Sequence, residues 1–202
     1  MTLSDDRVAR FARQLIVPGF AELGQLRLQE ARVRVVGAEA AVGPALAYLV
    51  EAGVGRVWID DPELVGPADA AGWLYGPAAV GRPRAEAARE ALARLSRFAS
   101  VEPYPVGGVP TAALVSASSV AQALAAAEAA RRAGVPHAVL EPDADGGAVV
   151  SIPPRAPCYS CARSPVGAGR PPLPSGWALA ALAAAELVQM IAAPGELPGR
   201  RI

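Results

Sequence analysis

A strand–turn–helix pattern around Gly37 contains the residues best placed for phosphate chemistry. The β-branched run at residues 33–36 ends at Gly37, and an alanine-rich segment typical of a helix follows it. In nucleotide-binding α/β folds, the free N–H groups at the start of such a helix bind phosphate. This turn has few glycines, however, and Glu39 brings a carboxylate close to the place of the phosphate. The pattern therefore indicates the fold more strongly than it indicates phosphate binding.

The two cysteines of the chain, Cys158 and Cys161, form a C-x-x-C pair in a proline-rich stretch. Two thiolates fill only half of a tetrahedral zinc site. Redox-active C-x-x-C pairs stand at a helix start, whereas this stretch reads as a loop. The sequence favours a vestigial turn over zinc or redox chemistry, and no zinc is expected. His137, the sole histidine, has no nucleophile or acid nearby in the sequence, and we expect a structural role for it.

The elements that must position these residues form the pattern of one α/β domain. Of the 202 residues, 52% are hydrophobic and 19% are charged, which is typical of a globular chain with a large apolar core. Alternating segments predict a Rossmann-like, mainly parallel sheet with helices on both faces and an N-terminal helical arm. One domain over 1–202 would contain N-terminal helices at about 4–30, a core at about 31–152, and a proline-rich connection with a final helix at 153–202.

Hydrophobic periodicity and turn residues place the individual elements. Strands are predicted at 33–36, 56–59, within 100–106, and at 113–116, 136–140 and 148–152. Helices are predicted at 4–15, 21–30, from the Gly37 turn to 51, and at 84–97, 118–133 and from 175 onward. Ser118 and Ser119 are expected to cap the helix that ends at 133. In the second helix, Leu23, Leu26 and Leu28 are expected to form the apolar face.

Charge and hydropathy exclude several classes of partner. The chain has 19 basic and 19 acidic residues, so there is no broad electrostatic case for nucleic acid or an anionic membrane. The polar, acidic N-terminus does not resemble a signal peptide. The most apolar segment, 177–193, contains Glu186 and Gln189 and is short for a membrane span, so we expect a buried helix. Together with the cysteine content, this predicts a cytoplasmic protein without a membrane or nucleic-acid partner.

Seven stretches, in one order along the chain, resemble the ThiF/MoeB/HesA family, relatives of the ubiquitin-activating enzymes. They are RFARQLI (10–16), GQ (24–25), VVGA (35–38), PALAYL (44–49), AGVG (52–55), VGRPRAEAA (80–88) and PCYSC (157–161). Members of this family use ATP to adenylate the C-terminal glycine of a ubiquitin-like sulfur carrier. They are usually homodimers with a structural zinc. The resemblance therefore implies a homodimer and a sulfur-carrier partner.

The resemblance also implies which residues would remain of a nucleotide pocket. Gly37 is the first glycine of the family's glycine-rich loop, and Asp60 matches the acid expected on the ribose. Arg84 replaces a family lysine, and Arg13 matches an arginine that reaches the nucleotide of the partner subunit.

Other family positions are changed here. The loop Gly-Ala-Gly-Gly-Leu-Gly reads GAEAAV at 37–42, where the side chains of Ala40 and Val42 are expected to obstruct phosphate. The family's Asn-Leu-x-Arg-Gln aligns with ADAAG at 68–72, and its metal-associated aspartate aligns with Ser118. The second acid after strand two falls on Pro62, and the crossover segment and final strands of the family are expected to be missing.

These losses favour a degenerate, non-catalytic family member that binds or scaffolds a ubiquitin-like sulfur carrier or an active paralogue, with no catalytic residue and no cofactor. The alternative is an active ATP-dependent adenylyltransferase of the thiamine or molybdopterin sulfur-transfer type, which would need ATP and Mg²⁺. A weaker alternative is a dinucleotide-dependent oxidoreductase, because the same missing glycines spoil the dinucleotide fingerprint.

Overall fold

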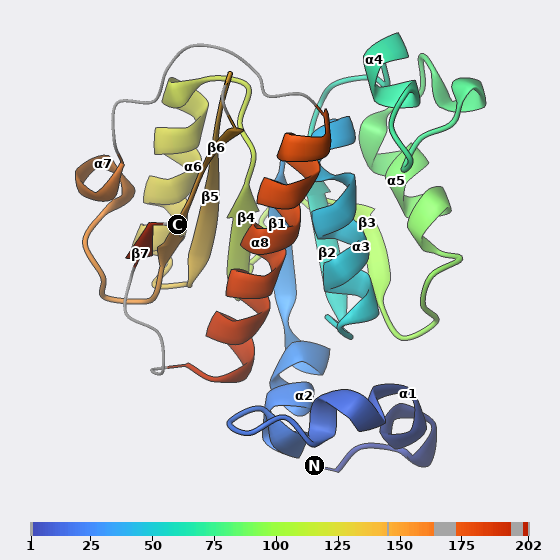
Figure 1. Cartoon of the computed structure of the whole chain (residues 1–202), viewed down its shortest axis with the longest axis vertical. Coiled ribbons are helices and arrows are strands. Elements are labelled where there is room, and N and C mark those ends of the chain that lie inside the picture. Colours follow the sequence, from blue (N-terminus) through green and yellow to red (C-terminus); the bar gives the residue numbers. More distant parts are fainter. Residues whose placement is uncertain (1, 145, 164–172, 195–199, 202) are drawn as a thin grey trace.

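A central sheet organises the computed structural model of the chain, which describes residues 2–144, 146–163, 173–194 and 200–201. Among these residues, seven strands lie in the order β3-β2-β1-β4-β5-β6-β7 (Figure 1). The strands are β1 (Arg32–Val36), β2 (Arg56–Asp60), β3 (Ser100–Pro103), β4 (Ala112–Val115), β5 (His137–Asp143), β6 (Gly146–Ile152) and β7 (Arg200–Arg201). Strands β1 to β5 pair in parallel, and β6 and β7 are antiparallel. The predicted Rossmann-like, mainly parallel α/β sheet is confirmed.

The described helices are α1 (Asp5–Leu15), α2 (Ala21–Glu30), α3 (Gly43–Glu51), α4 (Pro67–Ala70), α5 (Arg84–Leu92), α6 (Val120–Arg132), α7 (Tyr159–Ala162) and α8 (Leu173–Ala192). Helices lie in three of the four connections between successive parallel strands: α3 between β1 and β2, α4 and α5 between β2 and β3, and α6 between β4 and β5. Two 3₁₀ turns, η1 (Ala40–Val42) and η2 (Pro77–Ala79), precede α3 and α5. The predicted cap of α6 is present, because the Ser119 side chain accepts a hydrogen bond from the Gln122 N–H.

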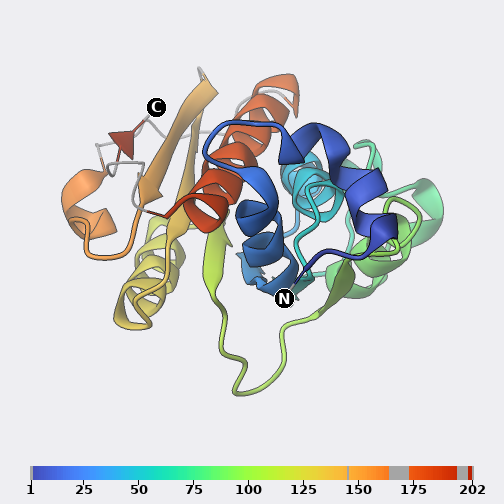
Figure 2. The same ribbon diagram turned by 90° about the horizontal axis from the view of Figure 1, so that it is seen from below.

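Both faces of the sheet are covered, because successive strand residues point to opposite sides. In β1, Val35 belongs to the apolar cluster of α3, α5 and α8, whereas Val36 belongs to a second cluster with α6 and α7. Figure 2 shows α3 and α8 on one side of the strands and α6 on the other. The arm formed by α1 and α2 lies at one end of the sheet (Figure 1).

Helix α8 is the most apolar helix in the described part of the chain. By length and composition alone, residues 174–192 could cross a membrane, but the core helix of a soluble protein meets the same criterion. Ala183, Ala184 and Leu187 are fully buried, and the helix packs on α2, α3, β5 and β6. The small alanine side chains let α8 approach the sheet closely, which agrees with the buried helix expected from the sequence.

Three expectations about the elements are wrong. Helix α5 ends at Leu92 instead of residue 97, because the chain turns there and Phe98 packs its ring 5.8 Å from that of Phe11 in α1. The sheet also contains one strand that the sequence does not predict, since the two-residue strand β7 pairs with β6. Part of the proline-rich connection, residues 164–172, lies outside the described residues.

The third error concerns the apolar face of α2. Leu23 is 57% exposed, and the buried positions are Gly24, Gln25 and Leu28. A Cβ at Gly24 would lie 3.3 Å from the Cβ of Ala192, so glycine permits the close contact between α2 and α8. Leucine spacing alone could not reveal this face, because it depends on the last turn of a helix that is distant in sequence.

We predict that Leu28→Ala lowers the free energy of unfolding by about 2–5 kcal/mol, because the lost side chain leaves a cavity in the core. Leu23→Ala on the same helix is the matched control and should change stability by less than about 0.5 kcal/mol, because its side chain is mostly exposed. Urea denaturation followed by circular dichroism measures both. Equal losses for the two variants would show that the assigned buried face is wrong.

Candidate functional site

The candidate site lies where the order of the parallel strands reverses, at the carboxyl ends of β1 and β4. Ligands of doubly wound α/β folds bind at this switch point. Gly37 directly follows β1 and has a φ of +85°, which side chains other than glycine rarely adopt. A Cβ on Gly37 would lie 2.0 Å from the carbonyl oxygen of Ser116, the residue after β4. Glycine is therefore required by both the turn and its neighbour.

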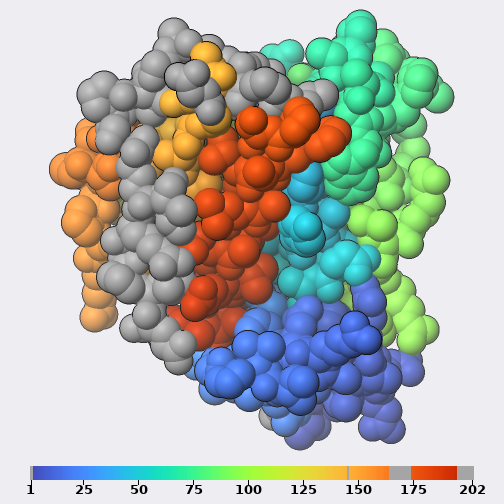
Figure 3. All heavy atoms as spheres, viewed as in Figure 1, coloured from blue at the N-terminus to red at the C-terminus, as the bar shows by residue number. Residues whose placement is uncertain are grey.

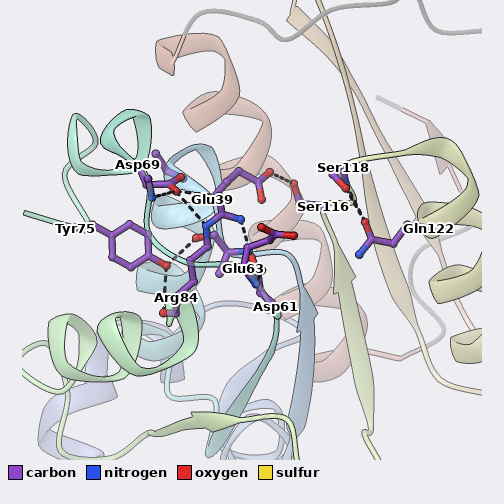
Figure 4. A network of polar contacts seen from close by, with 12 residues as sticks. Glu39, Asp61, Glu63, Asp69, Tyr75, Arg84, Ser116, Ser118 and Gln122 are labelled. Carbon is purple, nitrogen blue, oxygen red and sulfur yellow. Dashed lines mark hydrogen bonds and ion pairs between the residues drawn. The ribbon is translucent and has the colours of Figure 1, made fainter. Parts of the chain in front are cut away.

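Two backbone N–H groups of this turn are already bound by carboxylates of the same chain. The Ala38 N–H donates to Asp61 Oδ2 at 2.7 Å, and the Ala40 N–H donates to Asp69 Oδ1 at 2.9 Å. Figure 4 shows these carboxylates directed at the turn from the segments that follow β2. Free N–H groups at this place would bind phosphate oxygens. The carboxylate oxygens stand in the place of such phosphate oxygens.

Arg84, near the start of α5, holds both carboxylates in place. Its Nε and Nη2 donate to Asp69 Oδ2 at 3.1 and 2.9 Å, and its Nη1 donates to Asp61 Oδ2 at 3.1 Å. The side chain of Asp69 is only 7% exposed, that of Asp61 is 3% exposed, and that of Arg84 is 18% exposed. Burial alone would raise the pKa of Asp69, but the N–H groups of Gly66 and Ala40 and the Arg84 guanidinium together lower it. Asp69 is therefore held as a carboxylate.

Tyr75 is a buried member of this network and binds the same turn. Its hydroxyl donates to the Ala38 carbonyl oxygen at 2.7 Å, and burial raises the pKa of the phenol well above its usual value. The hydroxyl thus stays protonated and acts as a fixed donor to the turn.

The space left at the turn is small. The Ser116 hydroxyl donates to Glu39 Oε1 at 2.6 Å, and Trp177 Nε1 from α8 donates to the Ala40 carbonyl at 3.2 Å. The remaining cavity, lined by Glu39, Ala40, Asp69 and Ser116 among others, has a volume of about 90 Å³. Pockets for drug-sized ligands usually measure roughly 300–1,000 Å³. The volume of this cavity lies well below that range.

The expectation for Val42 is corrected. Its side chain is fully buried in the core beside α3 instead of obstructing the turn. Glu39 and Ala40 therefore account for the obstruction at this end.

The predicted site residues are brought together only in part. Gly37 and Arg84 lie in the network just described, whereas Asp60 accepts from Arg34 Nε at 2.8 Å on the sheet face opposite α3. Arg13 lies on α1, beside a groove of about 940 Å³ between α1, α3 and α8. Ser118 is hydrogen-bonded to Gln122 at the start of α6. The ribose role of Asp60 and the nucleotide role of Arg13 stay predictions.

Sequence reasoning missed Asp61 and Asp69, although each left a signal. Residues 58 and 60 lie on the same face of the sheet as Arg34 of β1, so the alternation of side chains indicates that Asp60 faces away from α3. The next acid, Asp61, is then the one placed to reach the turn. Asp69 follows Gly66 by three residues, the spacing at which an acid binds back to the first N–H of a helix, and it accepts from Gly66 N at 2.9 Å.

The cysteine pair differs from expectation in its local structure. Cys158 is the residue directly before α7, so the pair stands at the start of a short helix and not within a loop. No cluster of three or more His, Cys, Asp or Glu residues suited to a metal occurs in the part of the chain that the structure describes. The absence of bound zinc remains a prediction.

Comparison with known proteins assigns this chain to a family. The model of the ThiF family matches residues 11–127, more than half of the chain. The chain belongs to the ThiF family. The recognition made from sequence motifs is thereby confirmed.

Several curated relatives of this ThiF-family chain are named adenylyltransferases. The adenylyltransferase and sulfurtransferase MOCS3 of Mus musculus is 39% identical over 104 residues, which cover 51% of this chain and 23% of the relative. The molybdopterin-synthase adenylyltransferase of Salmonella typhimurium is 39% identical over 102 residues, covering 50% of this chain and 41% of the relative. The chain thus spans less than half the length of these relatives.

Solved structures share the fold at low sequence identity. E. coli MccB with ATP has a TM-score of 0.76 at 18% identity, covering 94% of this chain and 64% of that one. PaaA has a TM-score of 0.75 at 17% identity, covering 100% of this chain and 74% of that one. These likenesses support the arrangement of the sheet and its helices.

The lowered pKa of Asp69 predicts a specific loss of stability in acid. A depressed pKa stabilises the fold above the unfolded value of about 3.9, and this contribution is lost as the pH falls through the folded pKa. Between pH 6 and pH 3, the unfolding free energy of the wild type should fall more steeply than that of Asp69→Asn. At neutral pH the variant should be less stable by about 1–3 kcal/mol, because buried donors lose their charged acceptor.

Urea midpoints measured across this pH range provide the test. Asp6→Asn is the matched control, because the Asp6 side chain is 70% exposed and pairs with Arg97 at the surface. Parallel pH profiles for wild type and Asp69→Asn would contradict the assigned role of Asp69.

Proposed function

We propose that this ThiF-family protein is non-catalytic and that it binds or scaffolds a ubiquitin-like sulfur carrier or an active paralogue. The observation that carries the proposal is the occupation of the Ala38 and Ala40 N–H groups by Asp61 and Asp69. These donors would have to bind and polarise the phosphates during adenylation. They are instead part of the protein's own hydrogen-bond network.

Electrostatics at the turn support the same proposal. A phosphate entering here would approach Glu39, Asp61 and Asp69, while Arg84 already shares its charge between the two aspartates. A unit negative charge about 4 Å from one carboxylate is repelled by roughly 4 kcal/mol at an effective dielectric constant of 20. Binding of ATP would require the network to open and Arg84 to turn toward the phosphates.

Catalytic groups at the other family positions are also replaced. Ser118 stands where a metal-associated aspartate is expected and is engaged with Gln122. Phosphoryl chemistry rests on positioned cations and donors more than on covalent groups. A chain without them retains the surface of the fold but lacks means to stabilise the transition state.

The alternative, an active adenylyltransferase, is supported by the names of the relatives and their 39% identity over about half of this chain. It requires ATP and Mg²⁺ in a remodelled turn. Gly37 and Arg84 would face the phosphates, Asp60 the ribose, and Arg13 the nucleotide of a second copy. None of the comparisons reported above favours the dinucleotide-dependent oxidoreductase.

A homodimer is part of the proposal. Helices α1, α3 and α8 meet on the face of the molecule that Figure 3 shows. The groove between them is lined by apolar side chains, including Leu182 and Val188, by the 56% exposed Tyr48, and by the ion pair of Arg10 and Glu51. Arg13 lines the same groove, which fits a place at a subunit boundary. Exposed apolar side chains in a groove favour association with a second subunit.

We expect no pyrophosphate exchange above background from the purified chain with millimolar ATP and Mg²⁺ and a panel of carriers ending in Gly-Gly. Removing one transition-state donor typically costs about 10²–10³ in rate, and several are replaced here. The molybdopterin-synthase adenylyltransferase of Salmonella typhimurium with its own carrier serves as the positive control. Robust exchange by this chain would overturn the proposal and promote the alternative.

We further expect a dimeric mass in light scattering at tens of micromolar protein. Tyr48→Arg should shift the mass toward the monomer, because it places a charge in the apolar groove. Val120→Arg is the control, since Val120 is 52% exposed on α6, on the opposite side of the sheet. A monomeric wild type would refute the dimer without deciding the question of catalysis.

A further inference from the structure

A second group of reactive side chains lies at α7, which packs on α6 and β6. Cys158 and Cys161 face each other across the first turn of α7, with their sulfur atoms 2.9 Å apart. Cys158 is half-buried and Cys161 is exposed, and both are free thiols. Two thiols in contact at a surface can be joined by a disulfide without a large movement of the backbone.

The two thiols are not equivalent. Hydrogen bonds from the Cys161 thiol and backbone N–H, and then the charge of Arg131, lower the pKa of Cys158. The same thiol–thiol contact raises the pKa of Cys161. Arg131 also pairs with Glu128 at 2.7 Å, so only part of its charge acts on the cysteine. This asymmetry matches an attacking thiolate at Cys158 and a resolving thiol at Cys161.

A cavity of about 570 Å³ lies beside Arg131, whose charge also acts on Cys158, and its wall carries positive charge. It is lined by Arg131, Arg155, His137 and Ala156, with the prolines that follow β6. His137 is 1% exposed; its Nδ1 contacts the Val135 carbonyl oxygen, and its Nε2 has no hydrogen-bond partner within the described residues. Burial lowers the pKa of His137, so its Nε2 stays a neutral acceptor. The two arginines of the wall suit the cavity to a small anion.

We propose that Cys158 and Cys161 form a thiol–disulfide exchange site for the disulfide of a small anionic thiol, bound beside Arg131 and Arg155. The Cys158 thiolate attacks one sulfur of that disulfide, which forms a mixed disulfide and releases the first small thiolate. Cys161 then loses its proton and attacks the Cys158 sulfur, which releases the second small thiolate and leaves the Cys158–Cys161 disulfide. The protein dithiol is oxidised by two electrons and the small disulfide is reduced to two thiols.

This site is independent of the Gly37 turn and of whether the protein adenylates a carrier. The cavity lies near the start of β5 and the end of β6 and the cysteines stand at α7, whereas the turn lies at the carboxyl ends of β1 and β4. Failure of one proposal leaves the other unchanged.

The test uses the reduced full-length chain and oxidised glutathione as the probe, followed by alkylation of free thiols and mass spectrometry. The wild type should lose both free thiols without retaining glutathione. Cys161→Ser should retain one glutathionyl group on Cys158. Cys158→Ser should react more slowly by roughly tenfold or more, because the more acidic thiol is absent. Cys161 is exposed and Cys158 is half-buried, and circular dichroism checks that both variants keep the fold.

A charge-matched comparison tests the cavity itself. Arg131→Gln should slow reaction with oxidised glutathione several-fold more than it slows reaction with the uncharged 2-hydroxyethyl disulfide. Arg132→Gln is the control, because Arg132 is the next residue on α6, pairs with the same Glu128, and is 77% exposed. Equal effects of Arg131→Gln on both probes would remove the anion site from the proposal.

Two results would overturn the exchange site. The wild type could keep both thiols free in excess oxidised glutathione, or the two single variants could be glutathionylated at the same rate. A zinc ion bound in stoichiometric amount to the thiols of the purified protein would also overturn it, because both cysteines would then be metal ligands.

Discussion

The buried contact of Arg84 with Asp61 and Asp69 is the interaction on which the candidate site depends. It connects α5 with the segments after β2, and through the two aspartates it reaches the turn after β1. Each member satisfies a partner that would otherwise be a buried, unpaired polar group, so the three side chains stabilise one another. The same contact fixes the backbone of the turn in the conformation that Gly37 allows. Its formation occupies the Ala38 and Ala40 N–H groups, which an anion from solution would otherwise find free.

The fold and the phosphate chemistry of this ThiF-family chain are separable. The sheet is built on buried β-branched and leucine side chains such as Val35, Ile59 and Leu114, none of which belongs to the site network. Solved structures at 17–18% identity share the architecture for the same reason, because packing tolerates many apolar sequences. A few substitutions at one turn can therefore change the chemistry and leave the scaffold in place.

The sequence was sufficient to predict what depends on local pattern. The strands, the Ser119 cap, the buried apolar helix and the requirement for Gly37 follow from periodicity and turn chemistry. Residues whose roles depend on distant partners were assigned less well. The prediction of Asp60 instead of Asp61 overlooks the ion pair of Asp60 with Arg34, which joins two neighbouring strands. The prediction that Leu23 faces inward overlooks the contact of α2 with the end of α8, which is distant in sequence. The start of α7 was similarly hidden within a proline-rich stretch, which concealed the helical setting of Cys158.

The position of α8 has a consequence for the synthesis of the chain. Residues 173–192 pack against α2, α3, β5 and β6, and the Arg27 guanidinium binds the carbonyl oxygen of Ala192 at 2.8 Å. On the ribosome, translation reaches this helix long after α2 and α3 have emerged from the exit tunnel. Until it arrives, the apolar face that it covers is open to water and to other nascent chains, as is common for folding units completed late. The 172 residues before α8 thus expose apolar surface until the helix is made, and a pause in translation before residue 173 would prolong that exposure.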